Sequence, residues 1–122
     1  MNSETTSTGT PVDRLVIVPL RRVYENLICE FDHWDICLTG LVERDGERWF
    51  CEVCGQYEED IEYKLRPVKW NAECDEYLED YRVAYKHWFY ENGKRPYSYN
   101  GWDLSWFEEK WQHRNPIAEL SR

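Results

Sequence analysis

The pattern of apolar and polar positions divides the chain into a first half of predicted strands and a second half of predicted helices. Residues 14–18 form a β-branched run that Pro19 ends, as in a short strand. Leu27, Cys29 and Phe31 alternate with Ile28 and Glu30, which predicts a second strand. The alternation of apolar and charged residues over 61–65 predicts a last strand. Between the first two strands lies a small basic spot, Arg21-Arg22.

Two further strands, 36–43 and 47–53, flank Asp45-Gly46 and predict a tight β-hairpin. Asp-Gly is favoured in a two-residue type I′ turn, because both turn residues need a positive φ. This turn sets a register in which large apolar groups and opposite charges meet, as stable pairing requires. The predicted pairs include Val42 with Trp49, Leu41 with Phe50, Leu38 with Val53 and Glu43 with Arg48.

The same register assigns the residues of the hairpin to two faces. It puts Cys37 opposite Cys54 in a non-hydrogen-bonded pair, where Cβ atoms come closest. We assign the face without these two cysteines to the core and expect the other face to be at least partly wet. The predicted core face consists of Leu38, Gly40, Val42, Trp49, Cys51 and Val53.

After the last strand, the apolar positions recur at steps of three and four residues. This spacing predicts one long amphipathic helix over about 68–91, closed by Asn92-Gly93. Asp103 can cap a second helix, which Asn115-Pro116 should stop.

These elements predict an α+β fold: a four-stranded, mainly antiparallel sheet containing the hairpin 36–53, with two C-terminal helices packed on one face. A chain of 122 residues suggests one domain. We expect 1–12 to be a disordered tail and 13–122 to be a single α+β domain.

The net charge of -9 bears on which partners the chain can have. Nucleic-acid phosphates and anionic membranes are disfavoured, because binding them needs clustered Lys and Arg. A protein with a basic or mixed surface is the predicted partner, because such a surface is a better electrostatic match. The N-terminus has neither a basic start nor an apolar core, so a cytoplasmic protein is expected. An odd count of five cysteines then indicates reduced thiols.

The motif Cys51-x-x-Cys54-Gly55 is half of a zinc-binding signature. Cys37 and His33 could supply further ligands, and a structural zinc ion is one hypothesis. In a regular strand, however, residues three apart point to opposite faces, which argues against convergence of Cys51 and Cys54. Small buried thiols are the alternative, and an adventitious Cys37–Cys54 disulfide is a third.

The segment Asp32-His33-Trp34-Asp35 places a histidine between carboxylates that could orient its imidazole. Together with Cys37 and Cys54 it allows the hypothesis of a small metal-dependent or cysteine enzyme. The segment also fits a short polar connection between strands. Because no phosphate-binding loop, nucleophile elbow or zinc-protease helix is present in the sequence, we predict a non-enzymatic protein without a cofactor.

Acidic and aromatic residues are the candidates for binding a partner protein. The acidic rows could imitate DNA phosphates and fill the basic groove of a nucleic-acid-binding protein, or could simply be solvated surface. Trp and Tyr are enriched in interface hot spots. Aromatic residues at helical spacing are expected in the core, so those of the loop after the long helix are the interface candidates. The predicted partner-binding residues are Tyr97, Tyr99, Trp102 and Trp106 with Glu58, Glu59, Asp60, Glu76 and Asp80.

Four segments, 19–24, 34–40, 46–50 and 63–65, resemble small uncharacterised accessory proteins of actinobacterial bacteriophages. The resemblance covers about half of the chain. It implies an accessory gene product, with binding and inhibition of a host or defence protein as a plausible role, and it carries over no active site.

Overall fold

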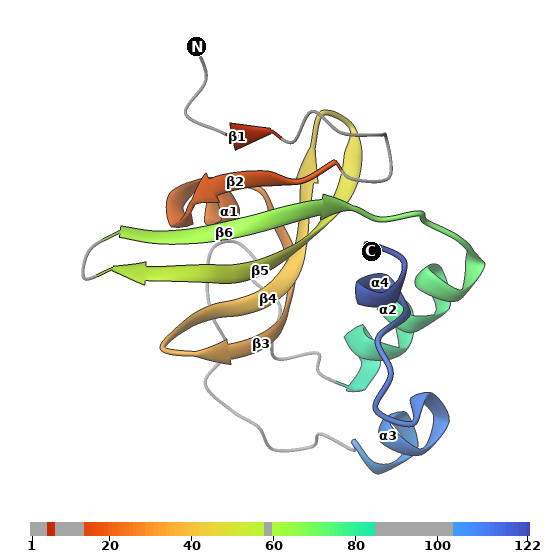
Figure 1. Ribbon diagram of the computed structural model, residues 1–122. Coiled ribbons are helices and arrows are strands. Elements are labelled where there is room, and N and C mark those ends of the chain that lie inside the picture. The colour runs from red at the N-terminus through yellow and green to blue at the C-terminus, as the bar shows by residue number, and fades with distance from the viewer. Residues whose placement is uncertain (1–4, 7–13, 58–59, 85–103) are drawn as a thin grey trace. The chain divides into compact units, whose positions relative to one another are not determined.

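The computed structural model describes residues 5–6, 14–57, 60–84 and 104–122 (Figure 1). The chain divides into a sheet unit, Met1–Val68 with Ser121–Arg122, and a helical unit, Lys69–Leu120. The single domain 13–122 and the packing of helices on the sheet stay predictions. Of the predicted tail 1–12, the structure describes Thr5–Thr6, which form a short strand. No helix in the described ranges is long and apolar enough to cross a membrane.

The sheet unit is built on an antiparallel sheet with the strand order β1-β2-β6-β5-β4-β3 (Figure 1). The α+β class and the antiparallel sheet are confirmed. The predicted number of four strands is too low. The sheet has five strands of four residues or more, and the two-residue β1 adds a sixth at its edge. The strands are β1 (Thr5–Thr6), β2 (Val16–Pro19), β3 (Leu27–Trp34), β4 (Ile36–Arg44), β5 (Glu47–Tyr57) and β6 (Asp60–Pro67).

A short helix, α1 (Leu20–Glu25), follows β2 directly and was not predicted. Six residues are too few to show a helical period, and Pro19 reads as the end of a strand although it also serves as the N-cap of α1. Val23 of this helix is fully buried in the core of the sheet unit. The basic spot Arg21-Arg22 therefore lies on a helix whose opposite side packs on the sheet.

The helical unit contains α2 (Ala72–Ala84), α3 (Ser105–Trp111) and α4 (Pro116–Glu119). α2 begins later than predicted, because the Asn71 side chain accepts a hydrogen bond from the Cys74 N–H at 3.0 Å and caps the helix. Residues 85–91 of the predicted helix, and Asp103, lie outside the described residues.

The predicted stop at Asn115-Pro116 is wrong. α3 already ends at Trp111, where Gln112 and His113 take left-handed φ values of 52° and 60°. Asn115 instead starts α4, since its side chain accepts hydrogen bonds from the N–H groups of Ile117 and Ala118. An Asn-Pro pair suits a helix start as well as a stop, because proline fits the first helical position.

The hairpin register is confirmed over most of its length. β4 and β5 pair from Arg44 with Glu47, through Val42 with Trp49, to Thr39 with Glu52. Asp45 and Gly46 have φ values of 52° and 77°, as a type I′ turn requires. The hairpin is therefore fixed by its turn and by cross-strand packing.

The predicted core face is confirmed for its central residues. Val42, Trp49 and Cys51 are buried in one cluster, and Val53 packs against it. The opposite face is less wet than expected, because Leu41 is fully buried on that side. The remaining members of the buried cluster are Val16, Val18, Val23, Cys37, Tyr63 and Leu65.

The prediction that Cys37 faces Cys54 is wrong. The ladder between β4 and β5 stops at Thr39, and Cys37 pairs with His33 of β3 instead. Leu38, which lies between Cys37 and Thr39, has no partner on β3. The alternation of side chains therefore inverts, and Cys37 turns into the core beside Cys51. Cys54 is the unmatched residue at a second irregularity, between β5 and β6.

Candidate functional site

The segment Asp32-His33-Trp34-Asp35 forms the tip between β3 and β4. Trp34 pairs with Ile36 across the tip, so Asp35 alone makes the connection, with a left-handed φ of 65°. Aspartate tolerates this conformation better than most residues, because its short side chain can hydrogen-bond locally. Trp34 is 77% exposed, although tryptophan is highly buried on average. A large apolar side chain therefore stands in solvent at this tip.

The paired ends of β5 and β6, at Tyr57 and Asp60, lie at the same end of the sheet as this tip, because the strands alternate in direction (Figure 1). We call this end, opposite the Asp45-Gly46 turn, the Trp34 end. Lys64 does not offset the acidic residues of this end by itself, because it forms an ion pair with Glu52 at 3.3 Å. Four acidic residues at the Trp34 end are exposed, and they are Asp32, Asp35, Asp60 and Glu62.

A buried polar network lies behind the tip. Glu30 is only 1% exposed, and its Oε2 lies 2.7 Å from Nδ1 of His33. The backbone of Cys37 is held from both sides, because its N–H donates to the Tyr24 hydroxyl at 2.8 Å and its carbonyl accepts from the Tyr63 hydroxyl. These bonds satisfy backbone groups that the broken β4–β5 ladder would otherwise leave unpaired.

The Cys37 thiol is not activated for nucleophilic chemistry. A hydrogen bond with Cys51 and burial raise the pKa of the Cys37 thiol well above its usual range. A nucleophilic cysteine needs the opposite shift, toward the thiolate. His33 and Cys37 are cross-strand neighbours and Glu30 orients the imidazole, as a cysteine enzyme would require, but the Cys37 thiol is fully buried.

The four predicted metal ligands do not come together. Cys37 and Cys51 adjoin in the core, whereas Cys54 is exposed at its bulge. Partial burial, with the charge of Glu62, raises the pKa of the Cys54 thiol. Over the described residues, no group of three or more His, Cys, Asp or Glu side chains is arranged to hold a metal ion.

The acidic row on α2 is engaged within the helical unit. Lys110 of α3 lies 2.8 Å from both Glu76 and Asp80, and these hydrogen bonds raise the pKa of its ammonium group. Arg114 reaches Glu73 at 3.5 Å and Glu119 at 2.7 Å. Glu76 and Asp80, two of the predicted partner-binding residues, therefore already have basic partners, which lie about thirty positions away and leave no local sequence signal.

The predicted aromatic site is only partly described. Trp106 is half-buried, with its ring 6.0 Å from that of Phe107 in an edge-on arrangement. It borders an aromatic cluster in which Tyr77 packs edge-on against Trp111 at 5.0 Å. The predicted residues outside the described ranges are Tyr97, Tyr99, Trp102, Glu58 and Glu59.

Trp34 is the surface residue that sequence reasoning missed. In the sequence, the segment 32–35 fits a polar connection whose histidine and carboxylates are its evident candidates for chemistry. The sequence does contain a signal for the exposure of Trp34. The residues around it, Asp32, His33 and Asp35, are polar, so no alternation of apolar residues assigns Trp34 to a core.

Comparisons of the chain with protein-family models, with curated proteins and with solved structures find no match.

Proposed function

We propose that the chain is a non-enzymatic protein-binding module that docks its Trp34 end on a basic surface of a partner protein. The exposure of Trp34 is the observation that carries this proposal. Burying a free tryptophan against a partner removes much apolar area from water, and tryptophan is enriched among the few residues that dominate binding energy.

Charge supports a basic partner. Asp32, Asp35, Asp60 and Glu62 lie at the same end of the sheet as Trp34, and the whole chain carries a net charge of -9. Such a field attracts a basic surface over distance and speeds association at low salt. The buried Trp34 side chain would then slow dissociation of the complex, because most differences in affinity lie in the dissociation rate.

The resemblance to phage accessory proteins makes a host or defence protein in the cytoplasm the first partner to test. An acidic DNA mimic is the weaker variant of this proposal, since Lys110 and Arg114 engage three carboxylates of the α2 row. The two variants differ in their competitor. Duplex DNA should displace the partner of a DNA mimic and should leave the partner of the Trp34 end bound.

The test is affinity capture from an actinobacterial lysate with the wild-type chain and two variants, Trp34→Ala and Val83→Ala. Val83 is the matched control, because it is also a large exposed apolar residue but belongs to α2. We expect Trp34→Ala to weaken capture of the partner at least about tenfold and Val83→Ala to leave it unchanged.

Capture should also weaken as salt rises, since screening reduces the attraction between exposed charges. Recovery of the same partner by Trp34→Ala at wild-type yield would overturn the proposal. So would the absence of any partner at both low and moderate salt.

A further inference from the structure

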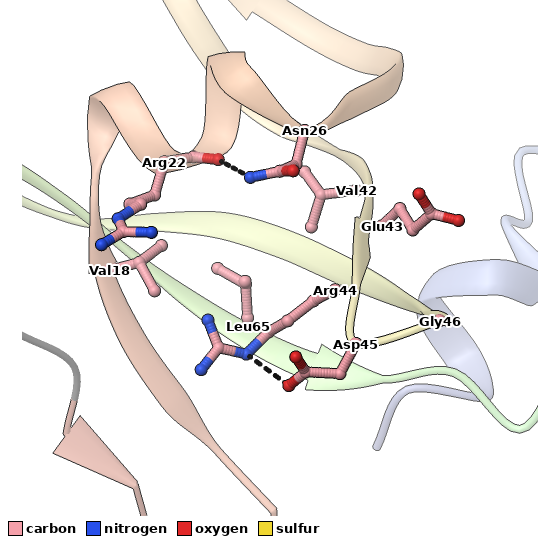
Figure 2. Close-up of a pocket in the computed structure, with 9 residues that line it drawn as sticks. All are labelled: Val18, Arg22, Asn26, Val42, Glu43, Arg44, Asp45, Gly46 and Leu65. Carbon is pink, nitrogen blue, oxygen red and sulfur yellow. Dashed lines mark hydrogen bonds and ion pairs between the residues drawn. The ribbon is translucent and has the colours of Figure 1, made fainter. Parts of the chain in front are cut away.

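A pocket lies at the opposite end of the sheet unit, between α1 and the β4–β5 turn (Figure 2). Its volume is about 430 Å³, which falls within the usual range for small-molecule sites. Val18, Val42 and Leu65 lie at its floor on three strands, although each is only 1–3% exposed. The other lining residues are polar, charged or glycine, and they are Arg22, Asn26, Glu43, Arg44, Asp45 and Gly46.

Two arginines give this pocket its chemistry. Arg22 comes from α1 and Arg44 from the end of β4, so the two guanidinium groups reach the pocket from different walls. In Figure 2 both groups extend on the side of Val18 and Leu65, whereas the carboxylate of Glu43 points the other way. The pocket thus gathers two guanidinium groups over a narrow apolar floor, in a chain whose overall charge is -9.

The two arginines differ in how much charge they have to offer. Arg44 lies 3.9 Å from Asp45, an exposed residue on the rim, and its guanidinium sits 5.7 Å from the centre of the Trp49 ring. Arg22 is exposed and forms no ion pair with a carboxylate of the described residues. Of the two guanidinium groups, that of Arg22 is therefore the one whose charge is less neutralised by neighbouring carboxylates.

The walls of the pocket are fixed to each other. The Asn26 side chain donates to the carbonyl of Arg22 at 2.9 Å and closes the end of α1. The Asn26 carbonyl accepts from the N–H of Glu43 at 3.0 Å, which ties that end to β4. A site held in this way loses little conformational freedom on binding.

We propose that this pocket binds a small organic anion, a carboxylate or a phosphate monoester with an apolar body. The guanidinium of Arg22 would take the anionic group, with Arg44 beside it, because arginine pairs with carboxylate and phosphate through parallel hydrogen bonds. The apolar body would lie over the narrow floor at Val18, Val42 and Leu65, where little of each side chain is accessible. This site is separate from the Trp34 end, so either proposal can fail without the other.

The test is an NMR titration of the full-length, ¹⁵N-labelled chain with benzoate, phenyl phosphate, inorganic phosphate and the uncharged analogue benzyl alcohol. Benzoate or phenyl phosphate should shift the amide signals of Arg22–Asn26 and Val42–Gly46 in a saturable way, and the tighter of the two identifies the head group. Benzyl alcohol and inorganic phosphate should each bind more weakly, because one lacks the charge and the other lacks the apolar body.

Arg22→Gln and Arg21→Gln form a matched pair of variants, since both positions are exposed on α1 and only Arg22 lines the pocket. Arg22→Gln should weaken binding about tenfold, and Arg21→Gln should leave it near the wild-type value. Amide signals outside the pocket should match the wild type in both variants.

Three results would overturn the proposal. The first is the absence of saturable shifts up to about 10 mM of either organic anion. The second is equal binding of benzyl alcohol or inorganic phosphate. The third is an equal loss in both variants, which would indicate general attraction to basic charge rather than a site.

Discussion

Strand β4 runs between two ends of the sheet unit that are built in different ways. At the Asp45-Gly46 end it pairs with β5 in an unbroken register. Along its other edge it pairs with β3 through three register shifts, up to the tip at Asp35. The regular end carries the arginine pocket, and the irregular end carries an exposed tryptophan among acidic residues.

This difference shows what each end needs for its stability. A regular hairpin is specified by turn chemistry and by side-chain pairs, all of which are local. A bulged pairing inverts the alternation of side chains and needs tertiary contacts to hold it. Behind the Trp34 end these contacts come from Tyr24 and Tyr63, which bind the backbone of Cys37. We therefore expect substitutions at the two ends to differ in cost.

The largest effect is expected at Gly40, where β3 and β4 come close. A Cβ at this position would lie 2.7 Å from the backbone oxygen of Cys29 and 3.2 Å from Sγ of Cys37. Because a backbone oxygen cannot swing aside, β3 would have to move. Gly40→Ala should lower the free energy of unfolding by about 3 kcal/mol, measured by urea denaturation. A cost below about 0.5 kcal/mol would show that the two strands are less tightly joined than this distance implies.

The next effect is expected from Tyr63→Phe, which removes the hydroxyl that binds the Cys37 carbonyl. A buried carbonyl left without its donor costs about 1–3 kcal/mol, and the same denaturation experiment measures it. Tyr24→Phe is the companion variant, since it removes the acceptor of the Cys37 N–H. If both variants were as stable as the wild type, the bulged strand would not depend on these hydroxyls.

The same network predicts a loss of stability in alkali. Burial raises the pKa of Tyr63 above its ordinary value of 10.0, and the hydrogen bond with Cys51 raises the pKa of Cys37 above 9.0. The folded chain holds both protons more tightly than the unfolded chain, so this stability is present below those values and is lost as the pH rises past them. Denaturation at about pH 7.5 and about pH 10.5 should show the fall, and Tyr63→Phe should make it shallower.

The smallest effect is expected at Gly46, in the turn of the regular end. Its φ is +77°, and a Cβ there would meet nothing within 4 Å. Gly46→Ala should therefore cost only the strain of a left-handed alanine, about 1 kcal/mol, in the same assay. Gly46→Asn should cost less, because asparagine tolerates this conformation. A cost equal to that of Gly40→Ala would remove the contrast between the two ends.

The contrast also explains which features could be predicted from the sequence. The Asp45-Gly46 hairpin and its core face follow from a local turn signal and from alternation. The position of Cys37 does not, because the unmatched Leu38 follows from how β3 meets β4 and not from any periodicity. α1 is too short to show a helical period, and Pro19, its N-cap residue, indicates the end of a strand and not the start of a helix.

Of the candidate site, the sequence supplied the acidic character and the importance of exposed aromatic residues. The position of Trp34 between two aspartates is a sequence signal for exposure, but only the one-residue connection at Asp35 establishes that the side chain stands in solvent. The sequence also placed Glu76 and Asp80 at the surface without their partner Lys110, because that ion-pair network joins two helices far apart in the sequence.

The position of β2 in the sheet has a consequence for how the chain folds. β3, β4, β5 and β6 follow one another as neighbours, so each pairing closes only a short loop. β2 instead pairs with β6, Val16 opposite Leu65, across nearly the whole sheet unit. Closing that long loop costs more entropy before any contact forms. We expect the four-stranded meander to assemble first and β2 to join it last, so that in pulsed hydrogen exchange during refolding the amides of β2 gain protection after those of β4 and β5.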